Sequence, residues 1–246
     1  MANPASAWNY GISIDFVGKA VEKVSGQSLD VYFRDNIFKP LGMNDTSFIL
    51  RPDQLNRLVK VHTRGPNGSA IPTDFMLPQN PEFFMGGGGF YGTAGDYLTF
   101  LQMLMHGGTF NRAEIFRPQV VKYMSENCID TAVNWMTQHP VANLSVPGVW
   151  KTTDGSASLD VDLAKMFPGQ HLKWGYSFLI NPQQGPNGRA RGSLTWAGLA
   201  NTYYWLDPTK RLAGVILTQS LPFWDPGVLG VYSQFEKSVY KALAAT

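Results

Sequence analysis

The sequence has 246 residues, 44% of them hydrophobic and 15% charged, which is the balance of a folded globular chain. Its net charge of +2, without a stripe of Lys and Arg, gives no electrostatic case for nucleic-acid binding. No apolar run reaches the roughly 20 residues that span a bilayer and residues 1–4 do not read as a signal peptide, so no membrane span is expected and the compartment stays open, with the cytoplasm favoured.

Four helices are predicted in the first half of the chain from apolar side chains at helical spacing and from capping residues. They cover about 10–25, 29–38, 93–106 and 118–127. Ser28 is expected to cap the second helix, and residues 39–43 (KPLGM) are expected to break it. Thr93 and Asp96 form a Thr-x-x-Asp variant of the capping box at the start of the third. Residues 51–84 lack periodicity and are expected to form loop with short strands.

The last third of the sequence predicts strands. They are expected at about 174–180, 191–198, 202–206 and 213–218. A closing helix is predicted over 228–245, with an apolar side made by the residues Val228, Val231, Phe235, Val239 and Leu243. Helices followed by a meander of strands and one more helix indicate an α+β fold instead of alternating βα units.

Several single features favour structural roles. The one cysteine, Cys128, is expected to be a small buried side chain. Asp15 is expected to be a capping or helix-surface residue. The four histidines are scattered without ligand spacing, so neither a metal site nor a cofactor is expected. The glycine run 86–89 precedes no phosphate-loop lysine, so a tight bend beside a cleft is favoured over an anion site.

Three groups of segments read as motifs when they are taken in chain order. They are residues 8–15 (WNYGISID) followed by 24–28 and 40–46, residues 86–97 (GGGGFYGTAGDY), and residues 194–198 (LTWAG). Together they resemble the superfamily of class C β-lactamases, D-peptidases and family VIII carboxylesterases. The resemblance covers almost the whole chain and implies a β-lactamase/transpeptidase-like fold, with an antiparallel sheet flanked by helices.

The resemblance also implies two regions. Residues 1–170 would form a mostly helical region that carries the tyrosine motif, and residues 171–246 would form the antiparallel strands and the closing helix. In the family, a Ser-x-x-Lys pair, a tyrosine and a substrate-binding strand carry out acyl-enzyme chemistry. A serine hydrolase of this kind needs no cofactor, and its substrate is a small ester or amide.

The family's tyrosine and strand have matches in this sequence. Tyr10 matches the tyrosine, which serves as general base. Trp196, Ala197 and Gly198 match the substrate-binding strand, and Leu199 after them would supply one amide of the oxyanion hole. These residues, with Tyr91 as a residue that lines the cleft, are the site implied by the resemblance.

Two departures from the β-lactamase pattern favour the esterase branch. Ile12 stands where the Tyr-x-Asn motif has asparagine, and Trp196 stands where the strand motif begins with lysine. A lysine there would face the carboxylate of a β-lactam, and a tryptophan cannot form that ion pair. Small neutral esters are therefore the favoured substrates.

The Ser-x-x-Lys motif has no match upstream of Tyr10. The one match in the sequence, Ser238 to Lys241, falls in the predicted closing helix and is expected to be a coincidence, although a site there is a third possibility. The N-terminal part of the family fold is therefore expected to be missing from these residues. A second polypeptide, a swapped oligomer or a longer protein would supply the serine. The alternative is a catalytically inactive binding or assembly module that keeps the cleft.

Overall fold

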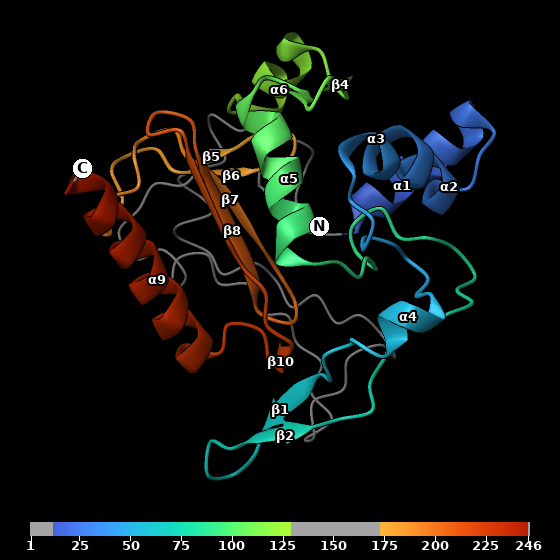
Figure 1. The fold of residues 1–246 in the computed structure, drawn as a ribbon, viewed down its shortest axis with the longest axis horizontal. Helices are drawn as coiled ribbons and strands as arrows, with labels where there is room; N and C mark the ends of the chain where they lie inside the picture. Colours follow the sequence, from blue (N-terminus) through green and yellow to red (C-terminus); the bar gives the residue numbers. More distant parts are fainter. Residues whose placement is uncertain (1–11, 129–172, 246) are drawn as a thin grey trace, which may run out of the picture. The chain divides into compact units, whose positions relative to one another are not determined.

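The computed structural model describes residues 12–128 and 173–245, which belong to two compact units. The helical unit contains residues 12–61 and 72–121, and the sheet unit contains the described residues of 62–71 and 122–245. Figure 1 labels their helices and strands. The boundary predicted at residue 170 lies outside the described residues. No helix in the described ranges has the length and hydropathy that a bilayer span requires.

The sheet unit is built on a five-stranded antiparallel meander in the order β5-β6-β7-β8-β9. Its strands are β5 (Lys173–Trp174), β6 (Leu179–Ile180), β7 (Leu194–Gly198), β8 (Thr202–Asp207) and β9 (Leu212–Ile216). The predicted α+β fold and the last three strands are confirmed. The single strand predicted over 174–180 is wrong, because Gly175 N donates to Phe178 O at 2.8 Å and turns the chain between two short strands.

A smaller sheet completes this unit. Its order is β10-β1-β2, formed by β10 (Ser220–Leu221), β1 (His62–Arg64) and β2 (Ala70–Pro72). The strands β1 and β10 pair in parallel, with His62 opposite Ser220. A segment from the first third of the chain therefore lies beside the segment that leads into the last helix.

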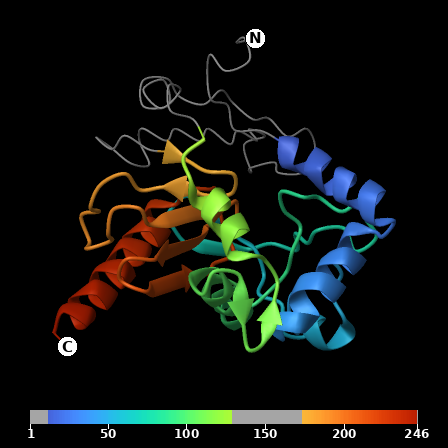
Figure 2. The ribbon, with the colours of Figure 1, turned by 90° about the horizontal axis from the view of Figure 1, so that it is seen from above.

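The helix α9 (Pro226–Ala244) runs along one face of the five-stranded sheet, as Figure 2 shows. The prediction of its apolar side is wrong for three residues: Val231, Phe235 and Leu243 are exposed. The buried side instead carries Val228, Glu236 and Tyr240.

Polar contacts dock this helix. Arg189 Nε lies 2.7 Å from Glu236 Oε1, and Tyr240 donates to Asp207 Oδ2 at 2.8 Å. The Arg189 guanidinium also stacks over the ring of Trp205, whose side chain is fully buried. Each buried charge therefore has a partner, which removes the cost that an unpaired charge would carry.

The helical unit begins with α1 (Ser13–Ser25). A continuous helical stretch follows, formed by α2 (Leu29–Phe33), the π-helical segment η1 (Arg34–Phe38) and α3 (Lys39–Leu41). The predicted cap is wrong: Ser28 makes no side-chain cap bond, and Glu22 Oε1 accepts from Leu29 N at 2.9 Å instead. The predicted break within residues 39–43 is confirmed, because the helical stretch ends at Leu41, and Pro40 itself still belongs to its last turn.

Glycine ends this stretch two residues after the proline. Gly42 has a φ of 72°, and its N donates to Lys39 O at 3.1 Å. The next amide, Met43 N, donates to Phe38 O at 2.8 Å. These two bonds are the Schellman pattern, which satisfies the last carbonyls of a helix.

The remaining elements of the helical unit are short except for one helix. They are α4 (Pro52–Leu55), α5 (Ala94–Met105), β3 (Thr109–Phe110) and β4 (Ala113–Glu114), and α6 (Pro118–Ser125) leads from this unit into the sheet unit. The predicted start of α5 is confirmed, since Thr93 Oγ1 accepts from Asp96 N at 3.2 Å. The prediction for Cys128 is wrong: the side chain is exposed, and its Sγ donates to Glu126 O at 3.3 Å.

One position in the core allows a matched test of packing. Trp205 of β8 lies opposite Gly214 of β9, and a Cβ on Gly214 would overlap the Trp205 ring. We expect Gly214→Ala to lower the free energy of unfolding by about 1–3 kcal/mol, because the buried ring has no space to move. Thermal or urea unfolding of the purified chain measures this.

The control for this prediction is Gly230→Ala in α9. No atom lies within 4 Å of a Cβ there, and alanine favours a helix by about 1 kcal/mol over glycine. Gly230→Ala should be neutral or stabilising. Equal destabilisation by both substitutions would contradict the packing argument.

Candidate active site

The candidate substrate strand β7 has one edge that the described strands cover only in part. Its residues Trp196, Ala197 and Gly198 pair with β8, whereas β6 pairs with β7 at Leu194 and Thr195. Beyond these two residues, no strand in the described part of the chain lies on the β6 side.

Strand periodicity shows which peptide groups face that edge. Asn181 N donates to Ser193 O at 2.9 Å, so the Ser193 carbonyl points toward the β6 side. Peptide groups on a strand alternate sides, so those of Thr195 and Ala197 point the same way. The N–H and C=O of Ala197 therefore point to the side of β7 where the pairing with β6 has ended. An extended ligand could pair with them there.

The side chain of Trp196 lies on the face of the sheet opposite α9. Thr195 is paired with Trp205, which packs under α9, and the next residue along a strand points to the other face. The Trp196 ring meets the Trp174 ring edge to face, with centroids 4.5 Å apart. This pair forms an uncharged aromatic surface beside the strand.

The strand ends in a tight turn. Gly198 lies opposite Thr202, and a Cβ on Gly198 would overlap the Thr202 hydroxyl, so a larger residue here would displace that hydroxyl. Asn201 N donates to Gly198 O at 3.0 Å and closes the turn, which leaves Leu199 and Ala200 as its two central residues. Leu199, the predicted oxyanion donor, is therefore the first residue beyond the substrate strand.

Tyr91 belongs to the helical unit. Its backbone exchanges two hydrogen bonds with Ser47, at 2.8 and 3.0 Å, and its hydroxyl accepts from Leu77 N at 2.9 Å. Burial raises the pKa of the Tyr91 phenol, so the hydroxyl stays neutral near neutral pH. The hydroxyl thus holds a loop, and the role of Tyr91 in lining a cleft remains a prediction.

Tyr10 lies outside the described residues, but the helix that follows it is described. Gly87 N donates to Asp15 Oδ1 of α1 at 2.8 Å, and a Cβ on Gly86 would overlap Ile14 O. The glycine run therefore lies directly against α1, and the Gly87 amide is used by a carboxylate of the chain. The contact between Asp15 and this run was missed from the sequence because it joins residues 72 positions apart.

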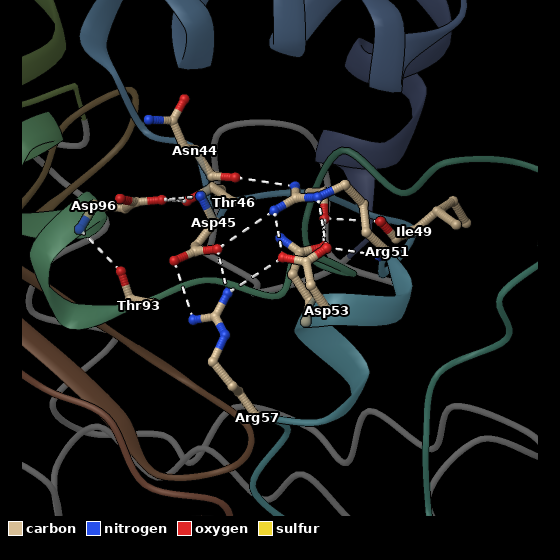
Figure 3. A network of polar contacts seen from close by, with 11 residues as sticks. Asn44, Asp45, Thr46, Ile49, Arg51, Asp53, Arg57, Thr93 and Asp96 are labelled. Atoms are coloured by element: carbon tan, nitrogen blue, oxygen red, sulfur yellow. Dashed lines mark hydrogen bonds and ion pairs between the residues drawn. The ribbon is translucent and has the colours of Figure 1, made fainter.

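A polar network holds the segment of residues 44–57 against the first turn of α5, as Figure 3 shows. Asp96 Oδ2 accepts from Asp45 N and from Thr46 Oγ1, both at 2.9 Å. Asp45 in turn pairs with Arg57 at 2.6 Å. The side chain of Asp96, the predicted capping-box partner, therefore joins the first turn of α5 to the loop at residues 45–46.

The alternative Ser-x-x-Lys match lies on the surface. Ser238 and Lys241 are both exposed on α9. Within residues 12–128 and 173–245, no cluster of His, Cys, Asp and Glu could hold a metal ion.

Asp225 connects the turn after β7 to the start of α9. It accepts from Arg64 Nε at 2.6 Å and Nη2 at 2.7 Å, and it caps α9 by accepting from Val228 N at 3.0 Å. Its own amide donates to the side-chain Oδ1 of Asn201 at 2.9 Å. The Arg64 guanidinium holds the pKa of the Asp225 carboxyl below its usual range.

Comparison with known proteins assigns the family. The sequence matches the family model described as Beta-lactamase over residues 2–230, so the chain belongs to this family. A mutant of simvastatin synthase from Aspergillus terreus has the same fold, with a TM-score of 0.82 and 26% identity over 99% of this chain and 57% of that chain. The predicted relationship and the β-lactamase/transpeptidase-like fold are confirmed.

Two relatives carry names that describe their chemistry. The ML-236A carboxylate methylbutanoyltransferase of Penicillium citrinum is 29% identical over 97% of this chain and 54% of its own length. The lovastatin esterase of Penicillium rubens is 24% identical over 98% of this chain and 58% of its own length. The chain therefore spans little more than half the length of these relatives, and the family includes both acyltransferases and esterases.

The lowered pKa of Asp225 predicts a pH dependence of stability. Because the pKa in the folded state lies below the unfolded value of about 3.9, the stabilisation is complete above that value and is lost as the pH falls through the folded pKa. Asp225→Asn should therefore lower Tm near neutral pH, and the difference from the unmutated chain should shrink in acid.

A series of thermal melts between about pH 7 and pH 2 measures this difference. Asp74→Asn is the control, because Asp74 also forms an ion pair, with Lys60 at 2.8 Å, but its side chain is almost fully exposed. Solvent screens such a pair, so its removal should hardly change the curve. A pH-independent loss in Asp225→Asn would show that the geometry of the hydrogen bonds at this position, and not the charge, stabilises the fold.

Proposed function

We propose that this chain contributes the tyrosine and the substrate strand to a serine carboxylesterase that acts on small neutral esters through an acyl-enzyme. The observation that carries the proposal is the strand β7: in a chain of the Beta-lactamase family, the motif Trp196 to Gly198 has an edge that no described strand covers. The acyl transfer and ester cleavage in the relatives' names support the same chemistry.

In the proposed reaction the serine of a Ser-x-x-Lys motif attacks the ester carbonyl carbon. Its proton passes to the oxygen of Tyr10, and the carbonyl oxygen becomes an oxyanion held by backbone amides, one of them from Leu199. The carbon–oxygen bond to the alcohol then breaks, and Tyr10 returns the proton to the leaving oxygen. Water hydrolyses the acyl-enzyme by the same steps, which releases the acid and restores the serine.

The serine and its lysine would come from outside residues 1–246. A second polypeptide, a swapped oligomer or a further part of a longer protein could each supply them. Ser238 and Lys241 of α9 are exposed, which supports a serine and lysine from elsewhere over this pair. The alternative is a module without catalytic activity that binds an ester or peptide reversibly along β7.

The aromatic surface supports neutral substrates. Trp196 and Trp174 present an uncharged face where the β-lactamase pattern has a lysine. An ester without a carboxylate loses no ion pair at such a surface and gains apolar contact. A substrate with an acyl chain of a few carbons fits this chemistry better than an anionic β-lactam does.

Acyl transfer to an alcohol is a second candidate function, because one relative is named a methylbutanoyltransferase. The acyl-enzyme is the same, and an alcohol oxygen replaces water in the second half of the reaction. An assay with a short p-nitrophenyl ester and an added alcohol distinguishes the two by the product, which is a new ester in one case and the free acid in the other.

The proposed mechanism predicts the behaviour of Tyr10→Phe. In the preparation that contains the serine segment, the substitution should lower kcat for p-nitrophenyl esters by about 10²–10⁴-fold, because the proton acceptor is removed. The labelling rate with a fluorophosphonate should fall in parallel. Tyr176→Phe is the matched control, since Tyr176 is largely exposed and should leave both rates unchanged.

The labelled residue decides between the alternatives. Mass spectrometry of the fluorophosphonate adduct should place it on the serine of a Ser-x-x-Lys segment other than Ser238, and Ser238→Ala should keep full activity. An intact preparation that takes no label at any serine would reject the esterase and favour the binding module.

A further inference from the structure

We propose that Asn201 is a positioning residue for the oxyanion hole, and this role rests on the proposed esterase function. Its side chain fixes the turn that presents the Leu199 amide at the end of the substrate strand. No motif in the sequence points to it. The evidence is a set of hydrogen bonds that use every polar atom of one fully buried side chain.

The amide group of Asn201 makes four hydrogen bonds. Nδ2 donates to Ser220 O at 2.7 Å and to Pro222 O at 2.8 Å. Oδ1 accepts from the Tyr203 hydroxyl at 2.6 Å and from Asp225 N at 2.9 Å. Two donors and two acceptor sites are all that an asparagine amide offers, so the group is fully used.

These four bonds connect the turn to three separate elements. Ser220 belongs to β10, Tyr203 to β8, and Asp225 to the start of α9. Asp225 is in turn bonded to Arg64 of β1. Burial raises the pKa of the Tyr203 phenol, so this hydroxyl remains a donor. The turn is therefore held to the whole end of the sheet unit and not only to its own hairpin.

The backbone around Asn201 is fixed as well. Its φ is 59°, in the left-handed region that asparagine and glycine enter most readily. Ser220 N donates to Ala200 O at 3.2 Å, and the Thr218 hydroxyl lies 2.9 Å from the carbonyl oxygens of both Ala200 and Asn201. The carbonyls of the two residues after Leu199 are thus bound to residues 218–220, which lead from β9 into β10.

Such rigidity matters for an oxyanion donor. A backbone amide stabilises a developing oxyanion only if it is already aimed at the right point, about 2.7–3.1 Å from the oxygen. A two-residue turn at the end of a strand would otherwise be one of the more mobile parts of a sheet. The Asn201 network therefore supplies the preorganisation that the Leu199 amide needs.

Two variants test the role of the amide. Asn201→Gly keeps the left-handed backbone and removes all four side-chain bonds. Asn201→Asp keeps the size and one acceptor but replaces the two donors, which leaves the Ser220 and Pro222 carbonyls facing a carboxylate. Asn187→Ala is the matched control, since Asn187 also contacts α9, through Ser233 and Glu236, without sharing a partner with Asn201.

Three measurements are made on the preparation that takes the fluorophosphonate label. Hydrogen–deuterium exchange follows the peptide that covers residues 196–203, fluorophosphonate titration counts active sites, and ester hydrolysis gives kcat per titrated site and KM. For Asn201→Gly and Asn201→Asp we expect faster exchange in this peptide and a kcat per site lower by about 10–100-fold, with KM changed by less than about threefold. Asn187→Ala should leave all of these values unchanged.

The outcomes separate the positioning role from the proposed function. If exchange does not increase, or if kcat per titrated site is unchanged and only the number of active sites falls, the positioning role is overturned. If Tyr10→Phe, measured in parallel, lowers kcat and Asn201→Gly does not, the esterase stands and only this role fails. If no preparation takes the label, the esterase fails and the positioning role fails with it.

Discussion

The buried carboxylate of Asp225 is the interaction on which the end of the sheet unit depends. It joins Arg64 of β1, the first turn of α9 and, through its own amide, the side chain of Asn201. A carboxylate that is almost fully buried is stable only when such donors surround it. Because β1 is about 160 residues away in the chain, this one group fixes a long-range connection and the local turn together.

The same principle governs how α9 lies on the sheet. Its apolar periodicity favours the side with Val231 and Phe235, yet this side is exposed. The loop between β6 and β7 presents Arg189 and the strand β8 presents Asp207 at buried positions, and these groups need Glu236 and Tyr240 as partners. An unpaired buried charge costs more than an exposed valine gains by burial, so the polar side faces the sheet.

Local signals predicted most elements, and their failures have long-range causes. The cap at Thr93 and the strands around Asp207 depend on neighbours in sequence, and they were predicted correctly. Ser28 has the right residue type for a cap, but its side chain makes no cap bond, and Glu22 of the preceding helix binds the first amide of the new helix, that of Leu29, instead. Asn201 looks like an ordinary hairpin residue, because its partners lie up to 24 positions further along the chain.

The candidate site likewise has a part that local sequence predicts and a part that depends on long-range contacts. The motif Trp196 to Gly198 is local in sequence, so the family resemblance located it, and the structure shows what holds it in place. Gly198 leaves space for the Thr202 hydroxyl, and Asn201 ties the following turn to the strand β10. Preorganised amides can stabilise the same oxyanion whether water or an alcohol attacks next. The choice between ester hydrolysis and acyl transfer must therefore depend on the side chains around the acceptor and not on this strand, which explains how one fold can include both transferases and esterases.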